Sequence, residues 1–433
     1  MDFVSWGILG IIVLLILFFL QVPVAYALAI VGVIGYSILA SPSAALNLLS
    51  RDLYGVFSSY GLALVPLFIF MGFIAFYAGV SRKLYEMAYR LTGGIRGGLA
   101  MGTVVACTAF GAVCGSTTAT AATIGSIAIP EMKRYGYGNK ISAGSVAAGS
   151  GLGILMPPSV VFIIYGILTQ ISIGKLFLAG ITPAILITIL FCIAVYFYSI
   201  ISPSQSPPGE KFPIKEKIKS IIDVWETLLV FSLVMGGMFF GIFTPTRAGA
   251  VGSFLLLVIV VIQKKLSWKN FVKAVYDTLN VSCMVIMLVA GATIFGHFLA
   301  LSRVSMEMAN LVSSLNLPGW GIVSIICLIY LIAGCFIDAL ALVTLTIPIF
   351  YPIIVSLGYD PVWFGVIIVL ITQMGIITPP VGVNAYIVKG LSPHIKLEEV
   401  FAGIVPFLIA LIIGTGIIIA CPKISLLLPE MVK

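Results

Sequence analysis

The chain has 433 residues, of which 61% are hydrophobic and only 9% are charged. A soluble domain carries about a quarter charged residues, so this composition excludes a soluble fold. The formal net charge of +8 does not indicate nucleic-acid binding, because the basic residues lie in short loops between apolar runs, where such residues set membrane orientation. We therefore expect one membrane domain that uses nearly the whole chain.

Apolar runs of roughly the 20 residues that cross a bilayer recur from Phe3 to Cys421. We expect these runs to be helical, since unpaired backbone groups are too costly in lipid. In chain order, the ten predicted crossings are approximately residues 4–20, 23–40, 54–78, 141–168, 176–201, 222–242, 246–262, 276–300, 362–388 and 400–421.

Two further stretches, residues 97–130 and 319–350, are apolar but broken by Gly, Ser, Thr and Pro. The first has basic residues on both flanks, so the positive-inside rule places both of its ends in the cytoplasm and predicts a re-entrant helical hairpin. If the second is a hairpin entering from outside, 17 of the 23 basic residues lie in cytoplasmic loops. Both ends of the chain are then expected outside.

The sequence also matches itself at an offset of about 222 positions. Residues 153–158, Gly-Ile-Leu-Met-Pro-Pro, align with residues 375–380, Gly-Ile-Ile-Thr-Pro-Pro, and three other short matches fall near the same offset. Chance similarity between apolar segments is the alternative. We predict two halves, residues 1–201 and 222–433, joined by a cytoplasmic linker at 202–221. Because the halves start on opposite sides, this is the inverted repeat of secondary transporters.

Each half combines a polar hairpin tip with a helix broken by a Pro-Pro pair. The tips are Gly-Ser-Thr-Thr-Ala-Thr at 115–120 and Gly-Cys-Phe-Ile-Asp at 334–338, and the breaks lie at 151–159 and 375–384. Proline frees carbonyl groups that can coordinate Na⁺, while helix N-termini favour anions. Hydroxyls that only bond their own helix are the alternative for the tip, and helix capping or pairing with a buried partner is the alternative for Asp338.

No Walker A sequence, metal-ligand cluster or nucleophile elbow is present, so we expect neither an enzyme nor an ATP-driven pump. An intramembrane enzyme or a channel is a further alternative, but the sequence shows no paired catalytic residues and no continuous polar face.

These tips and breaks resemble the large membrane (M) subunit of tripartite ATP-independent periplasmic (TRAP) transporters, within a superfamily that includes dicarboxylate/sodium symporters. The resemblance covers essentially the whole chain. It implies an elevator-type transporter of the bacterial inner membrane, which imports an organic acid such as a sialic acid, a C4-dicarboxylate or a sugar acid. A self-sufficient Na⁺/dicarboxylate symporter of the same superfamily is the alternative.

The resemblance also implies ligands and partners. Two or more Na⁺ ions would be coupling ions, and the partners would be a small four-helix membrane subunit and a periplasmic substrate-binding protein. One Na⁺ site transfers to Ser116, Thr118, Gly153, Met156 and Pro158. The second transfers to Gly334, Gly375, Thr378 and Val381. The residues expected to bind substrate are Thr117, Thr120, Ser159, Asp338, Pro379 and Asn384.

Overall fold

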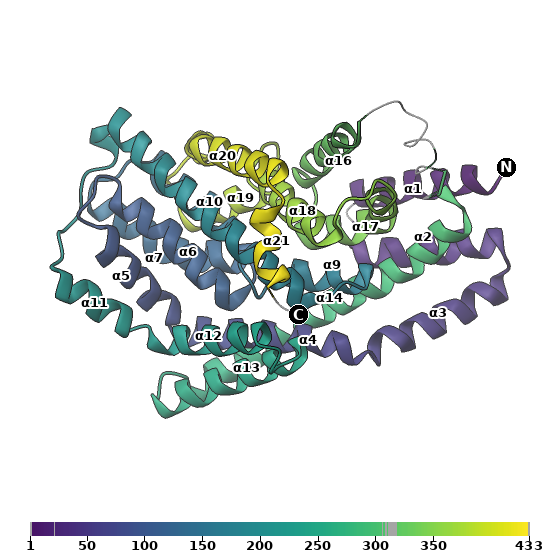
Figure 1. Cartoon of the computed structure of the whole chain (residues 1–433), viewed down its shortest axis with the longest axis horizontal. Helices are drawn as coiled ribbons and strands as arrows, with labels where there is room; N and C mark the ends of the chain where they lie inside the picture. Colours follow the sequence, from purple (N-terminus) through teal and green to yellow (C-terminus); the bar gives the residue numbers. More distant parts are fainter. Residues whose placement is uncertain (1, 21, 305, 308–309, 311–317, 432–433) are drawn as a thin grey trace.

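The computed structural model describes residues 2–20, 22–304, 306, 307, 310 and 318–431, which form helices joined by short loops (Figure 1). In the first 201 residues the helices are α1 (Phe3–Phe19), α2 (Val24–Leu39), α3 (Pro42–Phe57), η1 (Tyr60–Ala63), α4 (Leu64–Tyr77), α5 (Val80–Thr92), α6 (Gly98–Cys114), α7 (Thr117–Arg134), α8 (Asn139–Ser150), η2 (Gly151–Ile154), α9 (Val160–Thr169) and α10 (Ile173–Ile201).

After η3 (Pro203–Gln205) the chain continues with α11 (Ile214–Ile222), α12 (Trp225–Phe239), α13 (Pro245–Ile262), α14 (Trp268–Leu301), α16 (Gly319–Gly334), α17 (Ala339–Ser356), α18 (Pro361–Gly375), α19 (Val383–Leu391), α20 (Leu397–Ala420) and α21 (Lys423–Glu430). Helix α11 lies largely within the predicted linker.

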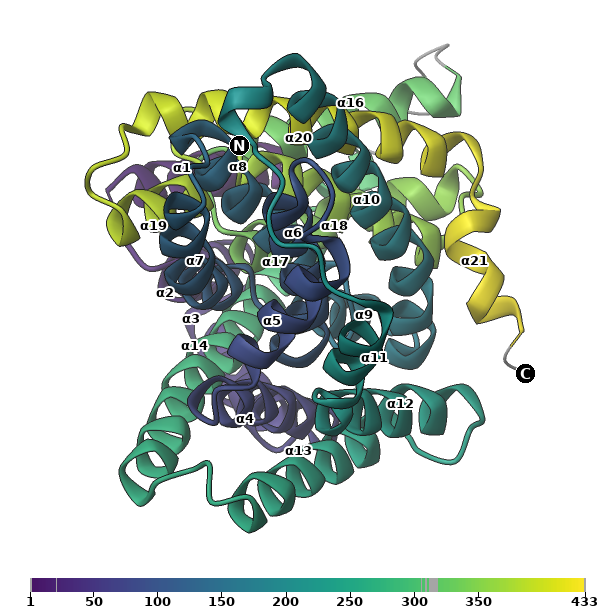
Figure 2. The ribbon, with the colours of Figure 1, turned by 90° about the vertical axis from the view of Figure 1, so that its left-hand side faces the viewer.

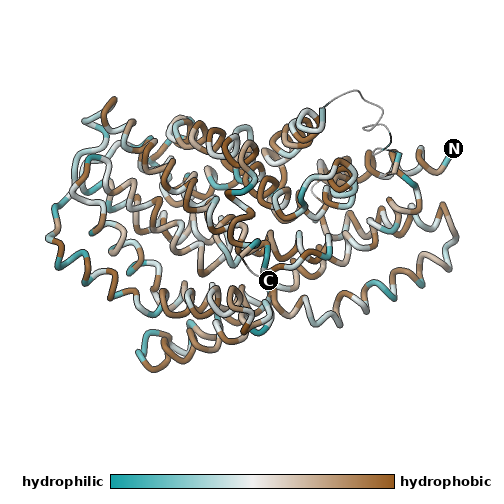
Figure 3. The backbone as a smooth tube through the Cα atoms, viewed as in Figure 1, coloured by the Kyte–Doolittle hydropathy of each residue, from teal (hydrophilic) through white to brown (hydrophobic). Residues whose placement is uncertain are grey.

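Within the described ranges, six helical segments are long and apolar enough to cross a membrane. They are η1 with α4, α10, α13, α14, α17 and α20, and the pair α11 and α12, bent by 57°, would make a seventh. Hydrophilic residues gather at helix ends and loops, whereas the helices themselves are mainly hydrophobic (Figure 3). The all-helical, multi-pass architecture predicted from composition is therefore confirmed.

The outward surfaces of the long helices are apolar. On α10 the side chains of Ile189 and Phe197 are exposed, and on α20 those of Val405, Ile409 and Ile412 are exposed. Soluble proteins rarely expose large contiguous apolar patches, so these helices face lipid.

Both stretches predicted as hairpins form helix–turn–helix units, and their entry and exit on one side of the membrane stay a prediction. The stretch 97–130 forms α6 and α7, and the stretch 319–350 forms α16 and most of α17. The predicted crossings 141–168 and 362–388 are each divided, into α8 and α9 and into α18 and α19, at the Pro-Pro breaks.

The predicted start of the third crossing is wrong. Residues 54–57 belong to α3, and the spanning segment begins only at Tyr60, after Ser58 and Ser59. The Ser58 hydroxyl donates to the Tyr54 carbonyl at 2.6 Å, where the end of α3 leaves carbonyls without helical partners. The helix that contains the predicted crossing 276–300 begins earlier: α14 starts at Trp268, capped by the Ser267 hydroxyl, which accepts from the Asn270 amide at 3.2 Å.

Helix α14 positions the candidate site. It packs along α2 and α4 and also contacts α3 and α17, while α8 packs between α20, α6 and α7. The two views agree that α4 and α13 lie side by side near one edge of the molecule, away from α20 (Figures 1 and 2). The hairpin tips thus meet α2, α4 and α14 inside the molecule.

Candidate functional site

The first hairpin turns between α6 and α7 at Gly115 and Ser116. Gly115 has a φ of +61°, a left-handed conformation that glycine adopts without strain. The Ser116 hydroxyl caps α7 by accepting from the Ala119 amide at 3.4 Å, and it lies 3.2 Å from the Thr118 hydroxyl. The Thr120 hydroxyl donates to the Ser116 carbonyl at 2.7 Å. The tip therefore gathers hydroxyl and carbonyl oxygens at the start of a helix.

The helix that follows this hairpin is interrupted. Helix α8 ends at Ser150, a 3-10 turn covers Gly151–Ile154, and α9 begins after Pro157 and Pro158 with Ser159 as its N-cap. Proline offers no amide hydrogen, so the backbone of this break cannot continue the helical hydrogen-bond pattern.

Tip and break are in backbone contact. A Cβ atom added to Gly111 would lie 2.6 Å from the Gly153 Cα, and one added to Gly115 would clash with the Pro158 carbonyl oxygen. A Cβ atom on Gly153 would lie 2.9 Å from the Ser116 carbonyl oxygen. Such an approach requires glycine. Three residues of the first predicted Na⁺ group, Ser116, Gly153 and Pro158, are therefore neighbours.

Two further residues belong to that predicted group. Thr118 joins it through its contact with the Ser116 hydroxyl. Met156 lies in the break itself, between Gly153 and Pro158, and its side chain is half-buried.

The second hairpin and break repeat this contact. A Cβ atom on Gly375, at the end of α18, would lie 2.6 Å from the Gly334 carbonyl carbon. The Thr378 hydroxyl donates to the Met374 carbonyl at 2.6 Å and so bonds within its own helical turn. Val381 lies near the end of the break with an exposed side chain. Gly334 and Gly375 are thus brought together, with Thr378 one turn further on.

The two breaks also touch one another. The Asn384 side-chain amide donates to the Ser150 hydroxyl at 3.0 Å and to the Ala147 carbonyl at 3.3 Å. The Gln373 side chain packs on Gly151, where an added Cβ atom would lie 2.6 Å from the Gln373 Cγ. Asn384 therefore links the second break to the end of α8.

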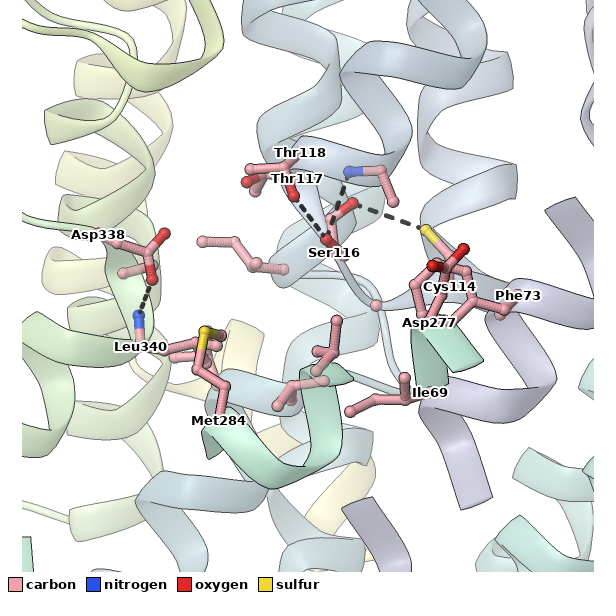
Figure 4. Close-up of a pocket in the computed structure, with 18 of the residues that line it drawn as sticks. Ile69, Phe73, Cys114, Ser116, Thr117, Thr118, Asp277, Met284, Asp338 and Leu340 are labelled. Atoms are coloured by element: carbon pink, nitrogen blue, oxygen red, sulfur yellow. Dashed lines mark hydrogen bonds between the residues drawn. The ribbon is translucent and has the colours of Figure 1, made fainter. Parts of the chain in front are cut away.

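A cavity of about 990 Å³ lies against both hairpin tips (Figure 4). Its remaining wall comes from the start of α2, from α4 and α14, from the start of α9, and from single residues of α6, η2 and α19, and most of that wall is aromatic or aliphatic. Four of the predicted site residues line it, namely Ser116, Thr117, Thr118 and Asp338. The Asp338 carboxylate caps α17 by accepting from the Leu340 amide at 3.0 Å.

The other predicted residues do not line this cavity. They are Thr120, Gly153, Met156, Pro158, Ser159, Gly334, Gly375, Thr378, Pro379, Val381 and Asn384. Thr120, Ser159 and Asn384 have no solvent exposure. Their proposed roles stay predictions, and the structure places them in the tips and breaks that support the cavity.

Among the polar residues of the cavity wall that were missed from the sequence are Tyr77 on α4 and Asp277 on α14. The Tyr77 hydroxyl donates to the Asp277 carboxylate at 2.5 Å. Asp277 falls just inside the predicted crossing 276–300, and an ionisable residue at such a position is itself a signal of function.

The comparisons identify the family of this chain. A family model described as "Tripartite ATP-independent periplasmic transporter, DctM component" matches residues 11–424. The chain belongs to this family. It is thus a membrane permease component of a tripartite transporter, as the resemblance of its tips and breaks implied. The DctM family is ATP-independent by description, and it is a family of permeases rather than of enzymes.

Relatives of this DctM-family permease differ in the substrates for which they are named. The C4-dicarboxylate TRAP transporter large permease protein DctM of Pseudomonas aeruginosa is 33% identical over 88% of this chain and 89% of its own length. The sialic acid large permease protein SiaM of Vibrio cholerae is 32% identical over 96% of both chains. The isethionate permease protein DctMQ of Oleidesulfovibrio alaskensis is 35% identical over 92% of this chain, which spans only 62% of that relative.

Similarity to a solved structure supports the fold of this chain and nothing about its function. The YdaH transporter of Alcanivorax borkumensis superposes with a TM-score of 0.64 at 14% identity and covers 90% of this chain and 89% of that chain.

Proposed function

We propose that this permease is the transporting subunit of a Na⁺-coupled, binding-protein-dependent importer of an organic acid in the bacterial inner membrane. Its partners are a small four-helix membrane subunit and a periplasmic substrate-binding protein. The observation that carries the proposal is the backbone contact between each hairpin tip and its break, beside a cavity large enough for an organic acid.

The chemistry of the tips supports Na⁺ as the coupling ion. The Ser116 hydroxyl and carbonyl, the Thr118 hydroxyl and the Gly153 backbone offer hard oxygen ligands within one small region. At the second tip, Gly334 and Gly375 allow carbonyl groups from two segments to converge near Thr378. Hard oxygen donors suit alkali cations, and discontinuous helices commonly provide them in secondary transporters.

The substrate would bind in the cavity between the two tips. Helices α7 and α17 both begin at its wall, and the positive end of a helix dipole favours a carboxylate or sulfonate group. Relatives are named for C4-dicarboxylates, sialic acid and isethionate, so the acid group is the feature that this proposal carries over.

Transport would follow an elevator mechanism. The hairpins and broken helices would move together as the transport domain, and the remaining helices would form the scaffold. This division is supported by the cavity, whose lining combines residues of the hairpins and broken helices with residues of α2, α4 and α14. Na⁺ can drive the motion only through a difference in affinity between the two states.

The test is uptake of labelled organic acids into proteoliposomes that contain the permease and its small subunit, with and without a Na⁺ gradient and the binding protein. Uptake that requires both supports the proposal. Uptake without a binding protein identifies a self-sufficient symporter instead, and uptake that ignores Na⁺ contradicts the cation sites.

Ser116→Ala and Thr378→Ala test the two sites separately. Each is expected to raise the Na⁺ concentration for half-maximal uptake by roughly tenfold, equivalent to about 1.4 kcal/mol of binding free energy. Ser126→Ala is the matched control, because Ser126 lies on α7 and, within the described residues, its hydroxyl bonds the Thr123 carbonyl at 2.8 Å and no other side chain or backbone group. Unchanged Na⁺ dependence in both variants would remove these two residues from the cation sites.

A further inference from the structure

Asn384 forms hydrogen bonds with both breaks at once. Its backbone amide donates at 3.3 Å to the carbonyl of Ile376, which directly follows Gly375 in the second break. Its side-chain amide donates to the Ser150 hydroxyl at 3.0 Å and to the Ala147 carbonyl at 3.3 Å, at the end of α8 where the first break begins. One residue therefore holds the two breaks in a fixed relation.

The Ser150 hydroxyl is itself held in place. It donates at 2.9 Å to the Ala147 carbonyl, the same carbonyl that accepts from the Asn384 side chain. Ser150 and Asn384 have no solvent exposure, so bulk water does not compete for these hydrogen bonds, and bonds in such surroundings are stronger than in water. The bridge from Asn384 therefore forms only when the end of α8 has the conformation that presents both acceptors.

A second amide side chain lies at the same contact. Gln373, near the end of α18, packs on Gly151, the first residue of the 3-10 turn in the first break. Within the described residues, Asn384 Oδ1 and both polar atoms of the Gln373 side chain have no hydrogen-bond partner. Buried polar atoms without partners reduce stability, so stability alone would favour apolar residues here. The two amides therefore indicate a functional role for this contact.

Residues of both predicted cation groups lie next to the bridge in the chain. Gly153 belongs to the 3-10 turn that begins directly after Ser150, and Gly375 ends α18 directly before Ile376. The segments that would supply carbonyl ligands to Na⁺ are therefore the segments that Asn384 holds together. An ion that orders one break reduces the conformational freedom of the other through the bridge, and the second ion then binds at a lower entropic cost.

We propose that Asn384 is a positioning residue that couples the two cation sites, rather than a ligand of the substrate. When Na⁺ orders one break, the bonds from Asn384 to Ser150 and Ala147 hold the other break in its ion-binding conformation. The coupling is reciprocal, so each ion raises the affinity of the other site by the same factor. This inference rests on the proposed function and adds a regulation of its two cation sites.

The experiment measures equilibrium binding of radiolabelled Na⁺ to the purified permease with its small subunit, with choline keeping the ionic strength constant. Equilibrium binding is used because uptake that needs two ions depends on Na⁺ in a sigmoidal way even without coupling. Two buried hydrogen bonds correspond to a coupling of roughly tenfold, which for two equal sites gives a Hill coefficient of about 1.5. The wild-type protein is expected to show this cooperativity.

Variants assign the cooperativity to the bridge. Asn384→Ala is expected to lower the Hill coefficient to about 1 and to raise the Na⁺ concentration for half-saturation by about threefold. Ser150→Ala removes one of the two acceptors and should have a smaller effect of the same kind, and it should add nothing to Asn384→Ala in the double variant. Ser142→Ala is the control, because Ser142 is also buried on α8 and its hydroxyl donates to the Gly138 carbonyl at 2.9 Å.

The outcomes separate the two proposals. A wild-type Hill coefficient of about 1, or cooperativity that both single variants retain, overturns the inference and leaves Na⁺-coupled transport standing. A lower thermal midpoint with unchanged cooperativity means that the bridge is merely structural, which also overturns the inference. If Asn384→Ala does not fold, Ser150→Ala decides, since it removes a single oxygen atom. Absence of saturable Na⁺ binding by the wild type overturns the proposed function, and the inference with it.

Discussion

Glycine residues determine how closely the hairpins approach the breaks. Gly334 and Gly375 meet backbone to backbone, as do Gly111 and Gly153. In both pairs the nearest atoms are main-chain atoms, which cannot rotate away from an added methyl group. The positions least tolerant of change in this site are therefore small residues rather than polar ones.

Gly375→Ala tests this contact. The added Cβ atom would lie 2.6 Å from the Gly334 carbonyl carbon, so we expect the free energy of unfolding to fall by about 1–3 kcal/mol. This destabilisation should lower the thermal unfolding midpoint and reduce uptake. Gly416→Ala on α20 is the control, because an added Cβ there meets nothing within 4 Å. Equal midpoints for the two variants would show that the second tip has room to move.

At the level of single residues, the sequence predicted part of the site. Ser116, Thr117, Thr118 and Asp338 were found because hydroxyl and carboxyl groups are unusual in apolar segments, and all four line the cavity. Asp277 carried a local signal, as an ionisable residue in a predicted crossing, but its place in the cavity wall depends on how α14 packs against α4. Backbone contacts between glycines are likewise invisible until the segments are placed.

Helix α5 connects α4, which lines the cavity, to the first hairpin, and polar contacts hold both of its ends against neighbouring helices. At its start, the Lys83 ammonium lies 2.7 Å from the Glu226 carboxylate on α12, which also accepts from Lys265 at 2.9 Å. Near its end, the Leu91 carbonyl accepts from the Lys217 ammonium of α11 at 3.2 Å. These bonds fix the orientation of α5 against α11 and α12.

Glu226→Gln is expected to loosen this attachment. The Glu226 side chain is only 6% exposed, but the side chains of Lys83 and Lys265 are about one-third exposed, so solvent screens the two ion pairs in part. We therefore expect the free energy of unfolding to fall by about 1–2 kcal/mol. The measurement is the thermal midpoint at low and high salt, with a smaller difference between wild type and variant at high salt. Glu86→Gln, on the exposed face of α5, is the control and should leave the midpoint unchanged.

Most elements were predictable because the length of an apolar run and the positions of Gly and Pro within it are local signals. These signals predicted the hairpins α6–α7 and α16–α17 and the divisions between α8 and α9 and between α18 and α19. Helices α3 and α5 were not predicted, because both are amphipathic and contain charged residues, whereas the predicted elements were continuous apolar runs. The relation of the two halves by an inverted repeat stays a prediction.

For the whole molecule, the elevator proposal requires the first hairpin tip to slide past α4. Gly72 on α4 packs directly on that tip, since an added Cβ atom would lie 3.2 Å from the Cβ of Cys114. A disulfide requires about 3.5–4.5 Å between Cβ atoms, so a small shift would permit one.

Gly72→Cys is therefore expected to form a disulfide with Cys114 under oxidising conditions and to stop uptake by holding the tip against α4. Reduction should restore uptake, and Gly72→Ser is the control of nearly equal size that cannot form the bond. Undiminished uptake by fully cross-linked protein would contradict movement of the hairpin relative to α4.

Helix α14 is longer than the membrane is thick. Its 34 residues extend about 51 Å, whereas the hydrocarbon layer is about 30 Å deep. The helix must tilt strongly or project from the lipid, and its first turns carry Trp268, Lys269 and Lys273, which suit the headgroup layer. Because Asp277 follows one turn after Lys273, the depth of this carboxylate is tied to where the headgroups hold α14. Bilayer thickness and anionic lipid content would then adjust the position of a cavity residue without any change in sequence.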